Sequence, residues 1–406
     1  MSEVVEIHVE FAGKTHLVGR LRYLAKTRRQ SSLFEYSDTW ISNPDAFALD
    51  PANLQLPIRQ HYWTAQKTAL PGAIRDCAPD RWGRQLIRRA FQKIGDKRRL
   101  SEVDYLLALN DYTRVGALRF RYDGESDFQN NIGQLTVPPL ISLPVLLNAA
   151  MAIQANTESA EDLRLLLNEG SPLGGARPKS AVLNSKGALA IAKFPKPGDD
   201  YSIPHGEILA LLLAEKAGIN AAKGNLQIVG GLPVALIQRF DRVREERIPF
   251  LSAMSLLGLQ DGDTAAYTDI AECIRMYSIS PTNDLHELWR RIIFNVMVSN
   301  LDDHLRNHGF LYADNNQWHL SPAYDLNPVP SYKKSRELTT WISEEGPEAD
   351  LELAYRAAPY FALKSGDAKN IVHEVADAIK NWQELALKLD MSKADMEIYE
   401  TAINIQ

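Results

Sequence analysis

Residues 299–311 read SNLDDHLRNHGFL, a stretch that crowds acids, amides, an arginine and two histidines into a few positions. The preceding residues 288–298, LWRRIIFNVMV, have the apolar spacing of a helix. A hairpin-like run over 309–321 follows, and then SPAYDLNPVP at 321–330 places Asp325 in a turn. So much charge and amide at the end of an apolar helix calls for a chemical explanation, and the rest of the chain narrows the choices.

Composition sets limits on the class of protein. The chain has 406 residues, 45% hydrophobic and 24% charged, which predicts two or three globular domains or lobes. A net charge of -6 argues against a general nucleic-acid coat, although a local basic patch remains possible. Cys77 and Cys273 form no CxxC, which favours a reducing compartment and argues against a cysteine-built metal site. The start MSEVVEIHVE does not resemble a signal peptide, and the longest apolar run, ILALLLA at 208–214, is too short to span a bilayer, so we expect a cytoplasmic protein with no membrane association.

The order of predicted elements indicates an α+β protein. Residues 4–11, VVEIHVEF, alternate like a strand, and APDRWGRQLIRRAFQKIG at 78–95 begins with Pro and Asp and then takes helical spacing. A helix is predicted over 205–219, with strands over 225–229 and 233–240, and the chain from about 252 is mostly helical. We predict three regions, 1–135, 136–240 and 241–406, of which the last two resemble two lobes around a cleft, where ligands usually bind.

A glycine-rich loop and a lysine precede the predicted helix. Residues 171–180 read SPLGGARPKS, and adjacent glycines let backbone N–H groups approach a phosphate, although a surface turn would look the same. This is not a P-loop, because Pro178 stands where the P-loop needs glycine. Lys193 ends the apolar strand ALAIAKF, and Glu207 lies near the start of the next helix. Protein kinases pair a strand lysine with a helix glutamate to hold the α- and β-phosphates of ATP, and the alternative is a lysine that snorkels to solvent.

The opening stretch fits kinase chemistry better than zinc chemistry. His304 and His308 are four residues apart, but Leu305 stands where HExxH needs glutamate, and no third ligand is evident. Asp302 and Asn307 have the spacing of the kinase catalytic loop HRDxxxxN, in which Asp accepts the substrate's hydroxyl proton and Asn binds magnesium. Asp325 then takes the place of the second magnesium-binding Asp, and Arg306 could neutralise phosphate charge or be an ordinary surface residue. Each acid alone could be a solvated loop residue, but their order predicts a site for Mg-ATP.

These blocks resemble the HipA family of bacterial toxin kinases. GGARPKS, AIAKFP, RFDR at 239–242, NLDDHLRNHGFL and SPAYDLNP are similar to its kinase core, and VGRLRY, APDRWGRQLI and VGALRF to the domain that precedes it. The resemblance covers nearly the whole chain. It implies a two-lobed protein-kinase-like fold with a strand-rich N-terminal domain and a mostly helical C-terminal lobe, and Ser/Thr protein kinase activity that uses ATP and Mg²⁺.

The resemblance also implies roles for single residues. Asp302 would be the catalytic base, Asn307 and Asp325 the magnesium ligands, and Ser171 the candidate for autophosphorylation, although Pro172 occupies the family's serine position. Gln238 and Phe240 would offer backbone groups to adenine. The residues expected around the ATP phosphates are Lys193, Glu207, Gly174, Gly175, Ala176, Arg177, Lys179 and Arg306.

Family members usually pair with a small helix-turn-helix antitoxin, here HipB-like, and meet operator DNA only through that complex. In the best-known members the phosphorylated target is an aminoacyl-tRNA synthetase. Two other functions stay open. One is a phosphotransferase acting on a small molecule, because Asp-x4-Asn cores also serve that role. The other is a weakly active ATP-binding co-repressor that bridges a DNA-bound antitoxin, which the presence of the whole core set disfavours.

Overall fold

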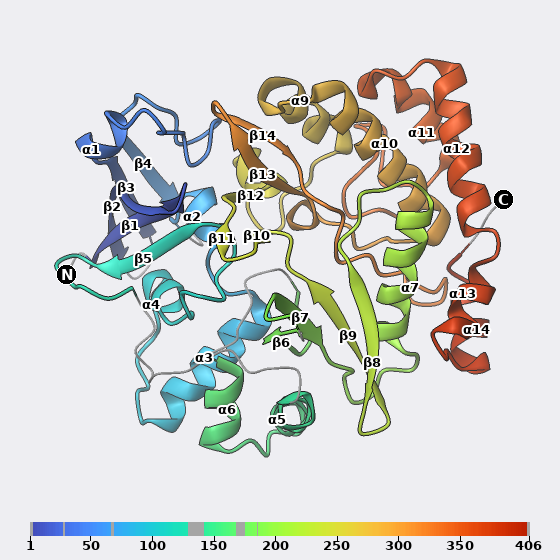
Figure 1. The fold of residues 1–406 in the computed structure, drawn as a ribbon, viewed down its shortest axis with the longest axis horizontal. Helices are drawn as coiled ribbons and strands as arrows, with labels where there is room; N and C mark the ends of the chain where they lie inside the picture. Colours follow the sequence, from blue (N-terminus) through green and yellow to red (C-terminus); the bar gives the residue numbers. More distant parts are fainter. Residues whose placement is uncertain are drawn as a thin grey trace. The chain divides into compact units, whose positions relative to one another are not determined.

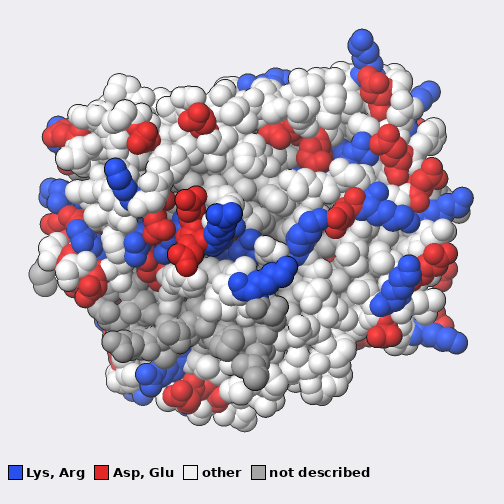
Figure 2. Space-filling model, in the orientation of Figure 1, with Lys and Arg blue, Asp and Glu red and all other residues white. Residues whose placement is uncertain are grey.

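The structure is a computed structural model that describes residues 3–26, 29–65, 69–128, 142–167, 175–184 and 186–403. The chain packs into two compact units, 1–197 with 239–251, and 198–238 with 252–406. Figure 1 colours the helices and strands in sequence order. Figure 2 shows basic and acidic side chains interspersed over one face. In the part of the chain that the structure describes, no helix is long and apolar enough to cross a membrane.

The first unit begins with a five-stranded antiparallel sheet in the order β4-β3-β2-β1-β5. Its strands are β1 (Glu3–Phe11), β2 (Lys14–Lys26), β3 (Arg29–Tyr36), β4 (Gln60–Ala65) and β5 (Leu118–Tyr122). The short pairs β6 (Lys179–Leu183) with β7 (Leu189–Lys193), and β10 (Arg242–Val243) with β11 (Glu246–Arg247), are also antiparallel. The helices of this unit are α1 (Asp38–Ile41), α2 (Gly72–Asp76), α3 (Arg81–Lys93), α4 (Glu102–Leu107), α5 (Leu143–Ala155) and α6 (Ala160–Leu167).

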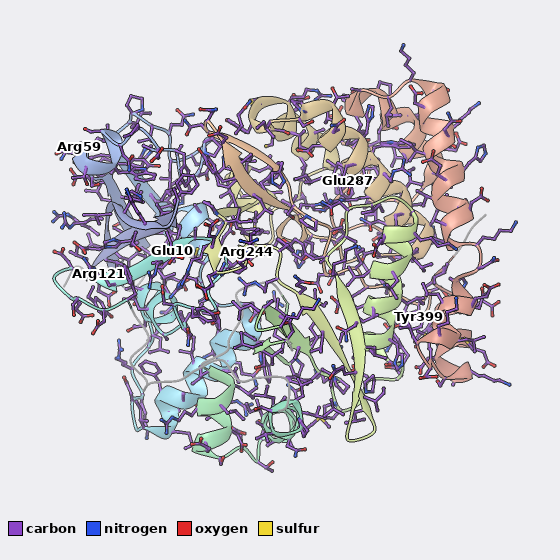
Figure 3. All side chains as sticks on the ribbon, in the orientation of Figure 1. Glu10, Arg59, Arg121, Arg244, Glu287 and Tyr399 are labelled. Carbon is purple, nitrogen blue, oxygen red and sulfur yellow. The ribbon has the colours of Figure 1, made fainter. Side chains whose placement is uncertain are left out.

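The predicted strand at 4–11 is β1, but its polar face is covered as well as its apolar face. Val5, Ile7 and Val9 are fully buried, as alternation predicts. Glu6 is also buried, because it lies in a row of charges across the sheet: its carboxylate accepts hydrogen bonds from Arg20 and Arg121, both at 2.8 Å. Figure 3 labels Arg121 at this sheet. Cross-strand pairing of opposite charges thus buries Glu6 on the polar face of β1, which the alternating sequence pattern predicts to be exposed to solvent.

The predicted helix after Pro79 is α3, and its start explains its sequence. Asp80 is the N-cap, and its side chain accepts a hydrogen bond from the Gly83 N–H at 2.8 Å. A side chain at Gly83 would put its Cβ 2.9 Å from the Cβ of Pro79, so the turn requires glycine. Trp82 is buried and its indole N–H donates to the Lys179 carbonyl at 3.0 Å, which ties α3 to β6.

The second unit is mostly helical, as predicted. Its strands are β8 (Gly224–Val229) paired with β9 (Leu232–Gln238), and β13 (Gly309–Asp314) paired with β14 (Gln317–Leu320). Strand β12 (Phe250–Ser252) carries the chain from the first unit into the second. The helices are α7 (Ile203–Lys216), α8 (Ala253–Leu256), α9 (Tyr267–Tyr277), α10 (Pro281–Val298), α11 (Leu351–Ala357), α12 (Ser365–Ile379), α13 (Trp382–Lys388) and α14 (Lys393–Glu400), with 3₁₀ helices η2 (Leu305–Asn307) and η3 (Ala358–Phe361).

Helix α10 forms the core of this unit and leads directly to the opening stretch. Its apolar residues, among them Leu288, Ile292 and Ile293, are fully buried. The helix ends at Ser299, whose φ of 54° is left-handed, a conformation that non-glycine residues rarely adopt. This reversal turns the chain out of the helix into residues 300–308, which we call the catalytic loop after the role that the sequence predicts for them.

Candidate active site

The two adjacent aspartates of the opening stretch have opposite environments. Asp303 is 2% exposed, and its carboxylate accepts hydrogen bonds from Asn295 Nδ2 and His308 Nε2, both at 2.8 Å, and from the Tyr267 hydroxyl. Asp302 is exposed, and among the described residues its carboxylate meets only the Thr339 hydroxyl, at 3.5 Å. Asp303 therefore holds the loop, while Asp302 keeps acceptor capacity for another molecule.

The charge of Asp303 is stabilised where it lies. Burial raises the pKa of Asp303. The electrostatic attraction of His308 and the hydrogen bonds from His308 and Tyr267 outweigh burial, so the pKa of Asp303 is lowered overall. Burial, followed by the charge of Asp303, holds the pKa of Tyr267 well above its usual value, so the phenol stays protonated and donates. The pair is thus a carboxylate with a neutral phenol, an arrangement that suits a scaffold.

Asn307 has the amide geometry expected of a metal ligand. The residue lies on η2 and is buried, and its Nδ2 faces the Asp302 carbonyl at 3.4 Å. Its Oδ1 is buried and has no hydrogen-bond partner in the part of the chain that the structure describes. A buried amide oxygen of this kind is costly unless something binds it, and Mg²⁺ prefers oxygen ligands. The described residues hold no cluster of three or more His, Cys, Asp and Glu side chains that could bind a metal by themselves.

Asp325 lies on a loop that is fastened to the same stretch. The Tyr324 hydroxyl donates to the Arg306 carbonyl at 2.5 Å, and the Asn327 N–H donates to Asn300 Oδ1 at 2.9 Å. Asp325 has a left-handed φ of 56°, and Asn327 Nδ2 contacts its Oδ1 at 3.2 Å. The structure therefore brings Asp302, Asn307 and Asp325 onto two loops that are joined by hydrogen bonds.

Arg306 is engaged by a nearby acid. Its Nε donates to Asp261 Oδ1 at 3.0 Å, and Asp261 is itself largely exposed. A surface ion pair of this kind contributes little stability, so the guanidinium can exchange partners. The predicted phosphate contact of Arg306 stays a prediction.

Lys179 has a partner that sequence reasoning did not find. Its ammonium is 2% exposed and lies 2.6 Å from Asp80, the N-cap of α3. A Cβ on Gly175, which has a φ of 99°, would lie 3.2 Å from this ammonium. The pair anchors the described end of the glycine-rich loop, and contact with phosphate would require Lys179 to leave Asp80. Gly174 and Ser171 fall outside the described residues, whereas Ala176 is exposed and Arg177 is half-buried.

Lys193 and Glu207 stand where the sequence predicts them in their own elements. Lys193 ends β7, pairs in register with Lys179, and is half-buried. Glu207 is 2% exposed on α7. Because the two residues belong to different units, their ion pair stays a prediction.

The RFDR residues 239–242 form hydrogen bonds within the first unit. Asp241 is fully buried and accepts hydrogen bonds from Arg239 at 2.6 Å and 2.5 Å, from Arg242 at 2.8 Å and from the Gly116 N–H at 2.7 Å. Arg239 also donates to the Thr113 carbonyl at 2.9 Å, and Arg242 to the Arg114 carbonyl at 2.6 Å. We call this cluster of 113–116 with 239–242 the RFDR clasp. Its two arginines hold the pKa of Asp241 well below its usual value against the effect of burial.

The residues predicted to meet adenine flank the start of this clasp. The Gln238 N–H donates to the Lys223 carbonyl at 2.8 Å, so of its two backbone groups the carbonyl is the one suited to adenine. Phe240 is half-buried, with its ring 6.4 Å from that of Phe250. Their predicted role at adenine stays a prediction.

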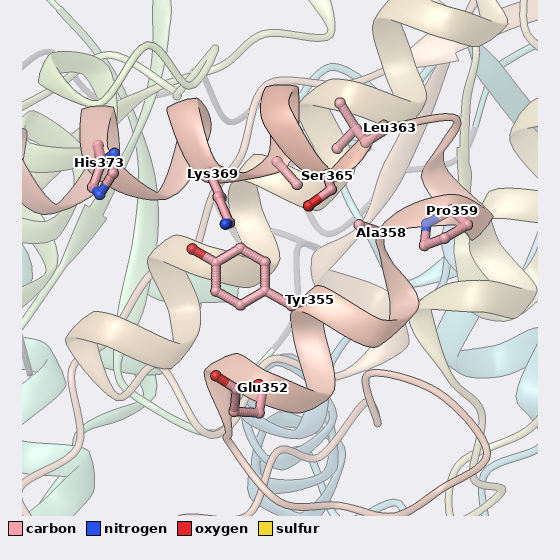
Figure 4. Close-up of a pocket in the computed structure, with 9 residues that line it drawn as sticks. Glu352, Tyr355, Ala358, Pro359, Leu363, Ser365, Lys369 and His373 are labelled. Carbon is pink, nitrogen blue, oxygen red and sulfur yellow. The ribbon is translucent and has the colours of Figure 1, made fainter.

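A pocket elsewhere in the second unit is separate from these residues. It has a volume of about 550 Å³ and is lined by α11, η3 and α12, with Tyr355, Lys369 and His373 among the side chains shown in Figure 4. The predicted site residues are not among those that line it.

Comparison with known proteins identifies the family. The family model described as "HipA N-terminal domain" matches residues 11–125. The family model described as "HipA-like C-terminal domain" matches residues 171–383, and this match alone covers more than half of the chain. The chain belongs to the HipA family. The resemblance on which the sequence analysis rests is thereby confirmed.

Relatives of this HipA-family chain carry kinase names. It is 29% identical over 146 residues to "Putative kinase Y4dM" of Sinorhizobium fredii, which covers 32% of the chain and 35% of that protein. It is 23% identical over 188 residues to "Putative kinase" of Haemophilus influenzae, which covers 40% of the chain and 54% of that protein. The chain thus spans about a third to a half of the length of the curated relatives it matches.

A solved HipA structure shows the fold. The structure is of the Shewanella oneidensis MR-1 toxin–antitoxin system, HipA with HipB and its operator DNA. The match has a TM-score of 0.67 at 15% identity and covers 98% of this chain and 94% of that one. The predicted α+β, kinase-like fold with a strand-rich N-terminal part is confirmed.

Proposed function

We propose that this HipA-family chain is an ATP-dependent protein kinase that phosphorylates Ser or Thr hydroxyls, and the toxin of a toxin–antitoxin pair. The observation that carries the proposal is the contrast at the catalytic loop. Among the residues that the structure describes, the exposed Asp302 carboxylate has one contact at 3.5 Å, and five residues later the buried Asn307 holds an amide oxygen without a hydrogen-bond partner. A base open to substrate beside an oxygen that can bind Mg²⁺ is what phosphoryl transfer to a hydroxyl requires.

Each residue then has a distinct task. Asp302 orients the substrate hydroxyl and accepts its proton as the oxygen attacks the γ-phosphate. Asn307 and Asp325 supply oxygen ligands to Mg²⁺, which when bound neutralises charge on the ATP phosphates. Lys193, oriented by Glu207, binds those phosphates, and the Gln238 carbonyl and the Phe240 backbone bind adenine. Asp303 fixes the loop so that Asp302 and Asn307 keep their spacing.

The biological partners follow from family membership. A HipB-like helix-turn-helix antitoxin is the proposed partner, since the solved HipA structure contains HipB and operator DNA. Operator DNA would be met through that complex. The target is proposed to be a cytoplasmic protein, with an aminoacyl-tRNA synthetase as the first to test. Ser171 remains the proposed autophosphorylation site, and mass spectrometry after incubation with Mg-ATP would test it.

The direct test is phosphoryl transfer from labelled ATP to proteins of a bacterial lysate, with Asp302→Ala as the control. We expect labelled protein bands with the wild type and none above background with the variant. Label that appears only in small metabolites would instead support a small-molecule phosphotransferase. Expression of the wild type should slow bacterial growth and expression of Asp302→Ala should not. Equal slowing by both would separate toxicity from phosphoryl transfer.

A further inference from the structure

The segment Leu389–Ala402, which includes α14, contacts two elements of the second unit that the proposed function uses. One is the first turn of α7, which carries Glu207, and the other is Ser299, which begins the catalytic loop. In Figure 1 the red helices α13 and α14 lie beside the yellow-green α7, and Figure 3 labels Tyr399 between them. The family description matches only as far as residue 383, so this segment lies beyond the matched domain.

Three contacts hold the start of α7. The Ser202 N–H donates to Asp395 Oδ1 at 2.8 Å, and the Tyr399 hydroxyl donates to the Ser202 carbonyl at 2.9 Å. Tyr399 is 1% exposed and fits only because residue 206 is glycine: a Cβ there would lie 1.9 Å from the tyrosine oxygen. His205 lies 3.1 Å from the Leu389 carbonyl through Nε2.

His205 completes this contact in its neutral form. Its Nδ1 lies 2.7 Å from the Ser202 hydroxyl, so an Nε2–H tautomer donates to the Leu389 carbonyl and accepts from the serine. Burial lowers the pKa of His205 and so favours that form. Ser202 and His205 at the start of α7 therefore both form hydrogen bonds with the segment Leu389–Ala402, close in sequence to Glu207.

The other end of the segment reaches the catalytic loop. The Ser299 hydroxyl donates to the Ala402 carbonyl at 2.6 Å, and the Ser331 N–H donates to the Thr401 hydroxyl at 3.2 Å. Ser299 is the left-handed residue from which the loop departs, and its carbonyl accepts the Val329 N–H at 2.9 Å. One segment thus bonds the helix of Glu207, the start of the loop of Asp302, and the chain that follows Asp325.

We propose that Leu389–Ala402 is a positioning strap that fixes Glu207 and the catalytic loop relative to each other for phosphoryl transfer. Asp395 and Tyr399 are positioning residues, because they act through α7 and touch no reacting group. The inference rests on the proposed kinase function. If the strap loosens, the first turn of α7 moves and displaces Glu207 in the next turn, and ATP is expected to bind more weakly because Glu207 is the proposed partner of Lys193.

The chain offers a matched control for Asp395. The acid caps α14 with Ser392, whose hydroxyl lies 2.6 Å from Asp395 Oδ2. Asp162 caps α6 in the same way with Ser159, at 2.7 Å, in the other unit. Asp395→Ala removes a cap and the bond to Ser202, whereas Asp162→Ala removes a cap alone.

The experiment measures hydrogen exchange and kinetics on the same full-length proteins. In Asp395→Ala and in Tyr399→Phe we expect amides 202–210 to exchange about tenfold faster, the effect of losing one hydrogen bond. We expect KM for ATP to rise by a similar factor. Asp162→Ala should change neither quantity. Asp395→Asn keeps an acceptor oxygen for the Ser202 N–H and should restore most of both.

The outcomes separate the strap from the kinase function. Unchanged exchange at 202–210 in Asp395→Ala would overturn the strap, and so would faster exchange with unchanged kinetics. A wild type that transfers no phosphate would overturn the proposed kinase function, and the exchange data would still show whether the segment holds α7.

Discussion

The RFDR clasp and the catalytic loop both gather aspartates and arginines, and they use them in opposite ways. In the clasp, Asp241 is fully buried and its carboxylate accepts four hydrogen bonds of 2.8 Å or less. In the loop, Asp302 is exposed, and among the described residues its carboxylate has one side-chain contact, at 3.5 Å. A carboxylate whose acceptors are filled by the protein holds structure together, while one whose acceptors are open can take a proton from a substrate.

The same contrast recurs between neighbours inside the loop. Asp303 resembles Asp241, since it is buried and three side chains bond its carboxylate oxygen Oδ2, although none of the three is an arginine. Asp302, one residue earlier, keeps its carboxylate in solvent. The sequence DD therefore joins the proposed catalytic base to a residue that holds the loop, and substitutions should separate the two.

The largest effect is expected on activity from Asp302→Asn. Loss of a positioned base should lower the rate of phosphoryl transfer by about 10²–10⁴-fold. Because the side chain is exposed and weakly bonded, the free energy of unfolding should change by no more than about 0.5 kcal/mol. Transfer assays and urea denaturation on one preparation measure both. Substantial unfolding with retained activity would reverse the comparison.

Asp241→Ala should do the opposite. It leaves two buried guanidiniums without their carboxylate, which should lower the free energy of unfolding by about 3–5 kcal/mol. Asp123→Ala is the control, since Asp123 pairs with Arg20 at the surface and its loss should cost about 0.2–1 kcal/mol. Urea denaturation of the two variants gives the difference. Equal losses would show that burial of the clasp contributes nothing beyond a surface pair.

Asp303→Asn should fall between these extremes. Asn295, His308 and Tyr267 all donate to Oδ2, and the neutral amide oxygen of an asparagine accepts such bonds more weakly than a carboxylate, so the change should lower the free energy of unfolding by about 1–3 kcal/mol. Transfer should also decline, because the loop that presents Asp302 is no longer fixed. Thermal denaturation and transfer assays would test this, with Tyr267→Phe expected to cost less because it removes a single donor. No loss of stability in Asp303→Asn would contradict its role as scaffold.

The smallest effect concerns pH. The pKa of Asp241 is lowered in the folded protein, so its stabilising contribution is complete above the unfolded value of about 4 and is lost as the pH falls through the lower folded value. The difference in unfolding free energy between the wild type and Asp241→Asn should be constant from pH 5 to 8 and shrink below pH 4. A difference that persists unchanged to pH 2.5 would show that the carboxylate is not ionised in the clasp.

Local pattern was enough to predict the strands and helices that flank the site. The Pro-Asp start of α3 and the apolar runs of α7 and α10 are signals that neighbours in sequence decide, and the structure has those elements. The spacing of Asp302 and Asn307 predicts a catalytic loop in the same way, and that role stays a prediction. Which of the two aspartates is open could not be predicted, because Tyr267 and Asn295 bury Asp303 from other helices.

Long-range ion pairs are contacts that the sequence could not predict. Lys179 was assigned to phosphate from its place after the glycines, but Asp80, 99 residues earlier, lies against its ammonium. Arg306 likewise pairs with Asp261, 45 residues earlier. The charge of a loop residue shows that it needs a partner, and only the fold shows which partner it has.

The bond between Ser202 and Asp395 has a consequence for the timing of synthesis. The two residues are 193 positions apart, and a ribosome that adds 5–20 residues per second needs roughly 10–40 s to reach the second from the first. Throughout that interval the helix of Glu207 exists without the residues that hold its first turn. If the chain is the proposed kinase, a chain still being translated would therefore lack the contacts that position Glu207, and a message cut short before codon 395 would yield a product with a higher KM for ATP.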